Sequence, residues 1–252
     1  MVIRGVYHPF YRFICTFGDN MDNKKCTVVI AAAGIGKRMG ADRPKQFLEI
    51  KDKPVLYYTI NAFEKNRSVD SIVIVTGVEN IEFCSKEIVE KYDFKKVKAI
   101  IEGGKERQNS VHNALNALNY DTDIVLIHDG ARPFVMQEDI DKVISFSHKY
   151  DGAVLAVKSK DTLKVADENG FVKETPDREF LWNIQTPQGF SYSLLKEAYD
   201  KAEEDGFIGT DDSSLVERLG KRVKLVEGHY TNIKITTKDD LLAAESILEG
   251  LE

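Results

Sequence analysis

The stretch that decides the fold is Cys26–Gly40, CTVVIAAAGIGKRMG, where an apolar run passes directly into a glycine-rich turn followed by basic residues. The run at 27–33 has the length and β-branched content of a strand buried on both faces. Gly34 and Gly36 allow backbone N–H groups to approach an anion, and two cations follow at once. A first strand that ends in a phosphate-binding loop is therefore predicted. A tight strand-to-helix turn with solvated basic residues is the alternative.

The glycine spacing argues against two familiar phosphate loops. Gly34, Gly36 and Gly40 miss the G-x-G-x-x-G spacing by one residue, and no Gly-Lys-Ser/Thr follows to make a P-loop. The second predicted strand ends in Val75-Thr76-Gly77, without the acid that would hold a ribose. A nicotinamide-dependent oxidoreductase is disfavoured for both reasons.

Beyond this stretch, short β-branched runs alternate with longer amphipathic ones, which is typical of βαβ units and a parallel sheet. Strands are predicted at 27–33, 71–76, 97–101, 124–128 and 152–157, and helices at 54–65, 80–91, 107–118 and 137–149. Together they predict one Rossmann-like, doubly wound, mostly parallel α/β sheet. Ligands in such sheets lie beyond the carboxyl ends of the strands, so polar residues there are candidates for function.

The last third of the chain departs from this rhythm. Residues 158–175 predict a polar β-hairpin that projects from the core, with its turn at Asp167–Gly170. Helices are predicted at 191–204, 211–219 and 238–248, and a strand near 222–227. The segment 231–237 alternates strictly, which predicts a short strand with Asn232, Lys234 and Thr236 on a ligand-facing side. An edge strand with a solvated polar face is the alternative.

Composition narrows the classes further. The 252 residues fit one large α/β domain, and the net charge of −6 offers no basic field for a nucleic acid. Cys15, Cys26 and Cys84 are widely spaced without a C-x-x-C, which favours neither disulfides nor zinc and indicates a reducing cytoplasm. The charge-free run at 26–36 is well short of the ~18 apolar residues that a membrane span needs.

The first residues fit neither a signal peptide nor a transit peptide. Residues 1–20 are aromatic-rich, broken by glycine and proline, and have no small-residue cleavage site. We expect residues 1–24 to be a dispensable extension, with the functional chain beginning near Met21. Residues 25–252 are then expected to form a single domain, with the arm at about 158–180.

Candidate functional residues follow several strands. Lys45 comes after a proline-stiffened bend, so Arg38 and Lys45 are expected to converge on one polyphosphate and stabilise transfer at its α-phosphate. Asp129 ends the fourth strand, where it can reach a Mg²⁺ that bridges phosphates, or a sugar hydroxyl, and Gly130 would let the ligand approach. A surface role for Lys45 and a cap for Asp129 are the alternatives. His128 is expected to be structural.

A second glycine turn follows the third strand. Gly103–Ser110 places two glycines at the start of a helix, an arrangement suited to contact with a base or a phosphate. A plain loop before a capped helix is the alternative.

Eight ordered motifs resemble one enzyme family. They are AAAGIGKRMG, RPKQFLEI, EGGKERQNSV, HDGARPF, VKSKDTLK, WNIQTPQGF, GTDDSSLVE and VEGHYTNIKITTKDDL. Over residues 26–249 the chain resembles the 2-C-methyl-D-erythritol 4-phosphate cytidylyltransferases. The resemblance implies a nucleotidyltransferase-type fold and transfer of CMP from CTP to methylerythritol phosphate in non-mevalonate isoprenoid synthesis. It also implies a requirement for Mg²⁺ or a similar divalent ion, and a homodimer whose hairpin arm crosses to the partner.

The resemblance also implies roles for individual residues. Arg38 and Lys45 resemble the transition-state stabilisers on the triphosphate, Lys234 the residue that positions the substrate phosphate, and Thr162 and Arg178 the arm residues that reach the neighbouring site. The nucleotide-binding positions that it implies are Ala32, Ala33, Gly34, Gly36, Lys37, Gly104, Ser110, Asp129 and Gly130. The implied substrate-binding positions are Thr162, Arg132, Thr210 and Thr236. Lys105 stands where the bacterial pattern often has an acid, so it is left out.

The residue inventory agrees with this chemistry. A phosphomonoester has a second pKa of about 6, so the attacking phosphate is already ionised near neutral pH and needs no strong general base. Two alternatives stay open: a ribitol 5-phosphate cytidylyltransferase, and a nucleotide-binding module without catalysis. The ribitol enzymes usually have more glycines in the loop and a threonine before the arginine, which favours the erythritol substrate here.

Overall fold

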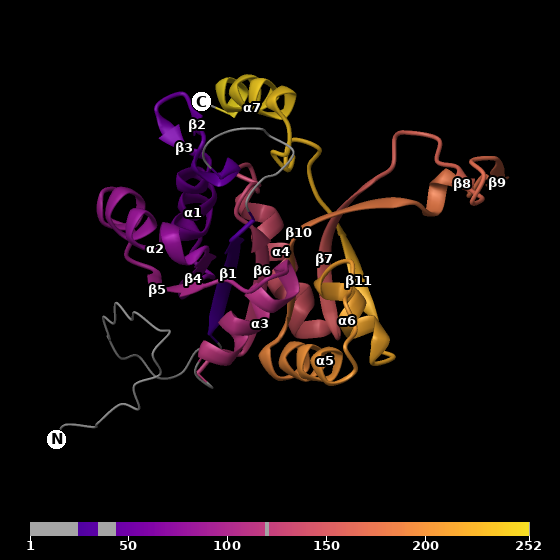
Figure 1. The fold of residues 1–252 in the computed structure, drawn as a ribbon, viewed down its shortest axis with the longest axis horizontal. Coiled ribbons are helices and arrows are strands. Elements are labelled where there is room, and N and C mark those ends of the chain that lie inside the picture. Colours follow the sequence, from indigo (N-terminus) through magenta and orange to yellow (C-terminus); the bar gives the residue numbers. More distant parts are fainter. Residues whose placement is uncertain (1–24, 35–43, 119–120, 252) are drawn as a thin grey trace.

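A seven-stranded mixed sheet forms the centre of the molecule, with strand order β11-β7-β10-β6-β1-β4-β5 (Figure 1). The structure is a computed structural model and describes residues 25–34, 44–118 and 121–251. The strands are β1 (Cys26–Ala32), β4 (Ser71–Thr76), β5 (Val97–Glu102), β6 (Ile124–Asp129), β7 (Gly152–Lys158), β10 (Trp182–Ser191) and β11 (Val223–Glu227). Neighbouring strands are parallel except for β10, which runs antiparallel to both β6 and β7.

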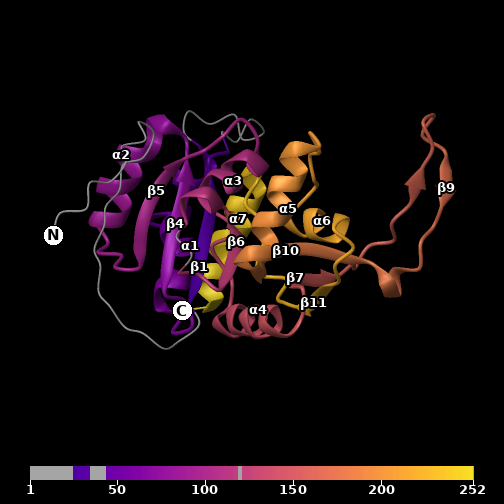
Figure 2. The same cartoon turned by 90° about the horizontal axis from the view of Figure 1, so that it is seen from below.

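Helices cover both faces of the sheet because successive side chains of each strand point to opposite sides. In β1, Val28 and Ile30 pack into the cluster that includes α1 and α4, whereas Val29 packs into the cluster that includes α3, α5 and α6. The helices are α1 (Val55–Lys65), α3 (Arg107–Ala117), α4 (Gln137–Lys149), α5 (Tyr192–Glu204) and α6 (Asp212–Arg218). Figure 2 shows α4 on one side of the sheet and α5 and α6 on the other. The doubly wound α/β fold predicted from the sequence is confirmed.

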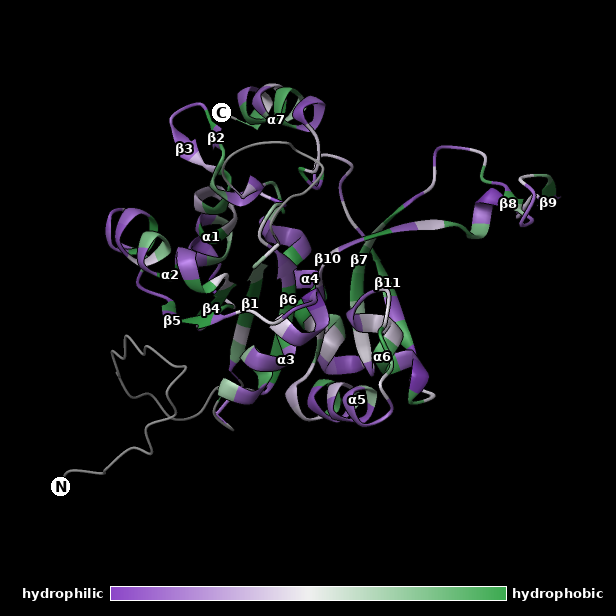
Figure 3. Cartoon of the chain, in the orientation of Figure 1, coloured by the Kyte–Doolittle hydropathy of each residue, from purple (hydrophilic) through white to green (hydrophobic). Residues whose placement is uncertain are grey.

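Burial on both faces explains why the strands read as continuous apolar runs. Every residue of β6 is buried, and so are the first six residues of β7. Figure 3 shows these central strands in hydrophobic green, with the hydrophilic colour concentrated on the helices and connections. Within the described ranges, no helix combines the length and the apolar character needed to cross a membrane.

A smaller apolar cluster closes one end of the sheet. It joins Ile50, Val55, Phe134, Ile235 and Ala244. These residues come from the β2–β3 hairpin, the start of α1, two loops and the last helix. The elements are β2 (Glu49–Ile50), β3 (Lys53–Pro54) and α7 (Lys238–Leu251). The cluster fixes the segment just before α7, which carries Lys234.

A hairpin arm leaves the core between β7 and β10 and projects far from the sheet (Figures 1 and 2). Its strands are β8 (Val165–Ala166) and β9 (Val172–Glu174), and a 3₁₀ turn, η4 (Arg178–Phe180), follows. The connecting turn is the one predicted from the sequence: the Asp167 carboxylate accepts hydrogen bonds from the backbone N–H of Asn169 and of Phe171. Gly170 has a φ of 84°, which glycine adopts without strain.

The structure differs from the prediction at residues 80–91 and at β10. Residues 80–91 were expected to form one α-helix, but the structure has a 3₁₀ turn η2 (Val78–Asn80), one α-helical turn α2 (Ile81–Phe83) and a π-helix η3 (Cys84–Glu90). Strand β10 was not predicted, because Pro187 and Gly189 interrupt its pattern. Its pairing with β7 is irregular between Ile184 and Gln188, where a proline that cannot donate to the ladder is tolerated.

The predicted strand within 231–237 does not form. Asn232 is fully buried, and its amide donates to the Gln185 side chain and to the Thr186 carbonyl at 3.1 and 2.9 Å. The Thr236 hydroxyl donates to Asp240 at 2.8 Å at the start of α7. Side-chain hydrogen bonds therefore fix this segment in place of a ladder, and Asn232, Lys234 and Thr236 do not share one ligand-facing side.

Candidate active site

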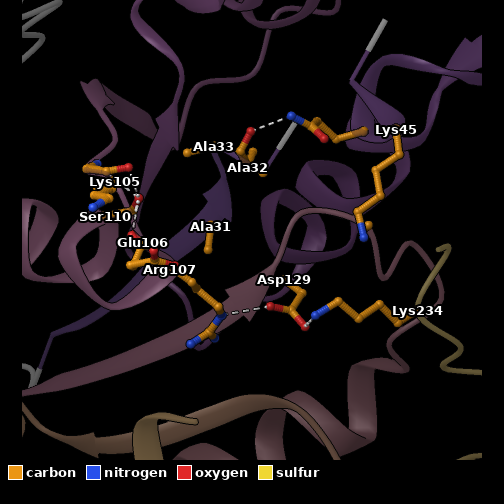
Figure 4. A pocket seen from close by; sticks show the side chains of 14 residues that line it. Ala31, Ala32, Ala33, Lys45, Lys105, Glu106, Arg107, Ser110, Asp129 and Lys234 are labelled. Atoms are coloured by element: carbon orange, nitrogen blue, oxygen red, sulfur yellow. Dashed lines mark hydrogen bonds and ion pairs between the residues drawn. The ribbon is translucent and has the colours of Figure 1, made fainter. Parts of the chain in front are cut away.

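A pocket lies at the carboxyl ends of β1 and β6, where the sequence placed the phosphate-binding loop (Figure 4). The residues that line it come from five separate segments of the chain. They are Ala31, Ala32, Ala33, Gly34, Lys45, Gln46, Gly104, Lys105, Glu106, Arg107, Ser110, Asp129, Ala131 and Lys234. We call this the first pocket.

Lys45 is held beside the end of β1 by its neighbour in sequence. Lys45 begins the 3₁₀ turn η1 (Lys45–Phe47), and Gln46 in that turn is buried. The Gln46 side-chain amide donates a hydrogen bond to the Ala32 carbonyl, and the Thr76 hydroxyl donates to the same oxygen at 3.3 Å. This contact ties the Lys45 turn to the last residue of β1.

The second glycine turn forms the opposite wall of the first pocket. Ser110 is buried, and its hydroxyl accepts from the Gly104 N–H and donates to the Glu106 carbonyl, both at 3.0 Å. A Cβ atom at Gly103 would lie 2.5 Å from the Cβ of Ala33. Glycine is therefore required here because the turn packs directly against the end of the β1 loop.

Asp129 is the centre of the charges in the site. Its Oδ1 accepts a hydrogen bond from Arg107 Nε at 3.1 Å, and its Oδ2 lies 2.8 Å from Lys234 Nζ and 3.5 Å from Arg132 Nε. Burial alone would raise the pKa of Asp129, but Arg107, Lys234 and Arg132 hold that pKa well below its usual value. The carboxylate is therefore ionised and surrounded by three cations.

Arg107 connects this centre to a second buried carboxylate. Its two terminal nitrogens donate to the Asp212 carboxylate at 2.9 and 2.8 Å, a bidentate geometry. Asp212 is fully buried at the start of α6, where the Tyr199 hydroxyl also donates to it. Burial would lower the pKa of Arg107, but Asp212 and Asp129 raise it well above the usual value.

A second pocket lies on the other side of the Asp129 centre. Its walls come mainly from β10, the loop before α6, and β11. They comprise Arg107, Asp129, Arg132, Val154, Ile184, Gln185, Thr186, Gln188, Thr210, Asp211, Ser213, Ser214, Glu217, Val223, Leu225 and Lys234. Arg107, Asp129 and Lys234 line both pockets, so these three side chains form a wall between them.

His128 is structural, as expected from the sequence. Its ring is buried between α1 and β10: Nε2 donates to the Arg132 carbonyl at 3.0 Å, and Nδ1 lies 3.0 Å from the Thr186 hydroxyl. Burial lowers the pKa of His128 to about 4. The imidazole is therefore neutral near pH 7 and unsuited to accept a proton in the reaction.

The buried histidine makes stability depend on pH. Between the usual pKa of about 6.5 and the folded value of about 4, the unfolded chain binds more protons than the folded chain. His128 is therefore expected to remove about 3 kcal/mol of unfolding free energy as the pH falls through this window. Urea unfolding across the window measures the loss. His128→Gln, which cannot titrate, should flatten the curve by that amount; an unchanged slope in this variant would contradict the assignment.

The sequence-derived candidates fall into four groups. Ala32, Ala33, Gly34, Lys45, Gly104, Ser110, Asp129 and Lys234 line the first pocket, and Arg132 and Thr210 line the second with Asp129 and Lys234. Thr162 and Arg178 are exposed on the arm. Gly36, Lys37 and Arg38 lie outside the described residues.

Two candidates have another task in this structure. Gly130 lines neither pocket; a Cβ atom there would lie 2.9 Å from the Ala32 Cβ and 3.2 Å from the Ala31 carbonyl oxygen. Its small size therefore serves the packing of β6 against β1, where the sequence reading expected ligand approach. Thr236, expected at the substrate, donates its hydroxyl to the Asp240 carboxylate in α7 and also lines neither pocket.

Three residues that hold the site were missed. Gln46 follows the chosen Lys45 in RPKQFLEI, and Arg107 lies between the chosen Gly104 and Ser110 in EGGKERQNSV. Asp212 follows Thr210 by two residues in GTDDSSLVE. No local pattern marked Arg107 at the start of α3 or Asp212 at the start of α6, because the contacts of Arg107 to Asp129 and Asp212 span 22 and 105 residues of chain.

Asp129 in the first pocket and Asp139 in a separate cluster each have a carboxylate that lies beside cations. Asp129 and Glu106 are the described acids of the first pocket, and both oxygens of Asp129 already face cations. A separate group of Glu138, Asp139 and His229 lies at the start of α4, but Lys142 lies 3.5 Å from Asp139. Divalent ions prefer several unpaired oxygen ligands. That Asp129 reaches a Mg²⁺ held mainly by the CTP phosphates stays a prediction.

The fold and the site define an α/β nucleotidyltransferase: a pocket at the carboxyl ends of β1 and β6, cationic side chains in its wall, and a second pocket across a shared wall. The comparisons with known proteins identify the family. The family model described as IspD, 2-C-methyl-D-erythritol 4-phosphate cytidylyltransferase, matches residues 26–250. The chain belongs to this family.

Individual relatives agree with the family match. A 2-C-methyl-D-erythritol 4-phosphate cytidylyltransferase of Clostridium botulinum is 48% identical over 90% of this chain and 99% of its own length. One from Caldanaerobacter subterraneus is 50% identical over 88% and 98%. The crystal structure of the 4-diphosphocytidyl-2C-methyl-D-erythritol synthase of Anaerococcus prevotii superposes with a TM-score of 0.80 at 36% identity, covering 90% of this chain and 96% of that one.

Proposed function

We propose that this chain transfers CMP from CTP to 2-C-methyl-D-erythritol 4-phosphate and releases pyrophosphate, in the synthesis of isoprenoid precursors. The observation that carries the proposal is the wall of Arg107, Asp129 and Lys234, which separates a glycine-lined pocket from a second polar pocket. A nucleotide in the first pocket and a phosphorylated polyol in the second would meet at this wall. The family match over residues 26–250 supports the choice of substrates.

The reaction needs charge neutralisation more than proton transfer. A phosphate oxygen of the polyol phosphate forms a bond to the α-phosphorus of CTP, and the bond to the β-phosphate oxygen breaks as pyrophosphate leaves with the electron pair. The attacking phosphate is ionised near neutral pH, since its second pKa is about 6. Lys45 and Lys234 line the first pocket, and we assign them, with Arg38, to the stabilisation of the charge that develops in the transition state.

In this proposal, a divalent ion enters the site bound to the substrate CTP. Magnesium ions usually bind through phosphates and a few carboxylates. Because both oxygens of Asp129 face Arg107, Arg132 and Lys234, we propose that Mg²⁺ or a similar ion arrives on the CTP phosphates. No step of the mechanism is assigned to it here.

The proposal treats residues 25–252 as one cytidylyltransferase domain, which agrees with the matched range of 26–250. The thiols of Cys26 and Cys84 are buried and unpaired, which fits a reducing compartment such as the cytoplasm. Residues 1–24 remain, in this proposal, a dispensable extension.

The arm supports a homodimer with a shared active site. Its exposed apolar side chains include Leu163, Phe171, Val172 and Phe180, of which Phe171 and Phe180 are 72% and 76% exposed. Such a projecting apolar surface favours burial against another protein surface. We propose that the arm lies on a second copy of this chain and brings Thr162 and Arg178 to that copy's second pocket.

Mixed dimers test the shared site. Arg178→Ala and Lys234→Ala are each expected to be nearly inactive as pure proteins. If Arg178 acts across the interface, a mixed dimer regains one site with both residues intact, so random mixing should restore about a quarter of wild-type activity. The measurement is pyrophosphate release after co-refolding or co-expression of the two variants. Activity no greater than the sum of the separate variants would show that Arg178 does not act across subunits.

Gly34 tests whether the loop approaches a nucleotide closely. A Cβ atom at Gly34 would meet nothing within 4 Å, so Gly34→Ala should leave the melting temperature unchanged. A phosphate close to the backbone would meet the added methyl group, and we expect the KM for CTP to rise about tenfold, equivalent to about 1.4 kcal/mol. Gly103→Ala is the comparison, since its Cβ would collide with Ala33 and should lower stability as well. A normal KM in Gly34→Ala would place the nucleotide elsewhere.

The proposed function is tested by pyrophosphate release from CTP and Mg²⁺ with each candidate acceptor. We expect strong preference for 2-C-methyl-D-erythritol 4-phosphate over ribitol 5-phosphate. Preference for the ribitol compound would retain the mechanism and change the pathway. Binding of CTP without turnover on either acceptor would support a nucleotide-binding module.

A further inference from the structure

The pair of Arg107 and Asp212 stands out because only one of its members reaches a pocket. Arg107 lines both pockets, whereas Asp212 lines neither and is fully buried at the start of α6. Buried carboxylates are costly unless they are fully paired. Asp212 is paired by the bidentate guanidinium of Arg107 and by the Tyr199 hydroxyl.

The contacts form one continuous chain from α5 to the centre of the site. The Tyr199 hydroxyl donates to Asp212, Asp212 holds the two terminal nitrogens of Arg107, and Arg107 Nε donates to Asp129 at 3.1 Å. Asp129 then holds Lys234 Nζ at 2.8 Å, as Figure 4 shows for the last two links. Oδ1 of Asp212 accepts from both Tyr199 and Arg107, which a carboxylate oxygen with two lone pairs can do, so all of the links exist at once.

We propose that Asp212 and Arg107 are positioning residues, which orient the Asp129 carboxylate and, through it, the Lys234 ammonium at the wall between the two pockets. Asp212 fixes the plane of the guanidinium, since a bidentate pair allows one orientation. The remaining Nε–H then fixes Oδ1 of Asp129, which leaves Oδ2 directed at Lys234. Only the kinetic test of this inference depends on the proposed function.

The alternative is that this pair only stabilises the fold. Removing one member would not separate the two roles, because a buried charge left without its partner costs about 3–5 kcal/mol. Replacing both charges together avoids that penalty and is often close to neutral. The double variant Arg107→Gln with Asp212→Asn therefore keeps hydrogen-bonding groups in place, including an acceptor for Tyr199, while removing the rigid bidentate pair.

The kinetic test compares this double variant with the wild type. We expect a melting temperature close to the wild-type value and a fall in kcat of about 10- to 100-fold, the usual effect of removing groups that orient an active-site side chain. The KM for CTP should change less than kcat, since the double variant leaves the glycines that line the first pocket unchanged. Near-normal kcat in a folded double variant would overturn the proposal.

A matched pair in the same part of the fold controls for general effects. Arg218 donates to Asp205 at 2.7 Å, and neither residue lines the two pockets. Arg218→Gln with Asp205→Asn should leave kcat unchanged. Arg107→Lys gives a second control, because it keeps the positive charge but removes the planar guanidinium that makes the bidentate contact. This variant should be as slow as the double variant; full activity would show that charge alone matters.

A measurement without turnover separates failure of this inference from failure of the proposed function. Carboxylate ¹³C NMR of aspartate-labelled protein, assigned with Asp129→Asn, follows the pKa of Asp129. We expect this pKa well below the usual value in the wild type and clearly higher in the double variant. If the wild type shows no turnover but the pKa of Asp129 still rises in the double variant, the proposed function is refuted and the positioning role of Arg107 and Asp212 is retained. If the pKa of Asp129 is the same in the double variant as in the wild type, Arg107 and Asp212 do not act on Asp129, and the inference is wrong whatever the turnover.

Discussion

Lys45→Ala is expected to lower kcat by about 10²-fold or more while the protein keeps its fold, in line with the loss of one preorganised charge. Lys45 lines the first pocket from the turn η1, whose position is fixed by Gln46 and the Ala32 carbonyl. Because Gln46 remains in the variant, the turn should stay in place. Steady-state pyrophosphate release and a thermal melt measure the two parts of the expectation.

Lys105 provides the matched control for this variant. It carries the same charge and lines the same pocket, but it belongs to the glycine turn on the opposite wall. Lys105→Ala should change kcat little. Equal losses in the two variants would mean that the pocket responds to total charge, and Lys45 would lose its place in the mechanism.

Lys234→Ala is expected to lower kcat/KM for methylerythritol phosphate by about 10²-fold, because a charge-assisted contact to phosphate is lost where the two pockets meet. The fold should tolerate this change: Asp129 keeps Arg107 and Arg132, and the Lys234 side chain is 37% exposed. The loss should be larger for methylerythritol phosphate than for CTP, as measured by varying each substrate separately. Equal losses for both would mean that Lys234 acts in the transition state without holding the ground-state phosphate of methylerythritol phosphate.

Lys238→Ala is the control for general surface charge. Lys238 is exposed at the start of α7, four residues further along the same segment. Its replacement should leave both KM values unchanged, which would confine the effect to the lysine at the shared wall.

The fold was largely predictable because each parallel strand can be recognised from its own stretch of sequence. Strand β4 and helix α4 have the predicted bounds, and β1 differs by one residue at each end. Such strands are buried on both faces and therefore read as apolar runs. The antiparallel strand β10 carries Asn183, Gln185 and Pro187, and it forms because β6 and β7 supply partners on both sides. No local sequence pattern predicts that β10 pairs with those two strands.

The site was predictable where chemistry sits in a local motif. The glycine loop, Lys45, Asp129 and Lys234 could be chosen from the sequence, and the structure brings their described members to one pocket. The supporting contacts could not be foreseen, because they depend on residues that meet only in the folded chain. Arg107 and Asp212 are 105 residues apart in sequence, and Gln46 binds a main-chain oxygen that no pattern marks.

The pairing of β10 with β7 on both sides of its irregular stretch has a mechanical consequence. The ladder runs out to Trp182 and Lys158 at the base of the arm, and the irregular stretch that follows places Gln185 and Thr186 in the second pocket. We expect a tilt of the arm to displace these two residues, because β10 connects the arm directly to the pocket wall. If a second copy of the chain holds the arm, specific activity depends on protein concentration, and dilution alone lowers the turnover of each molecule.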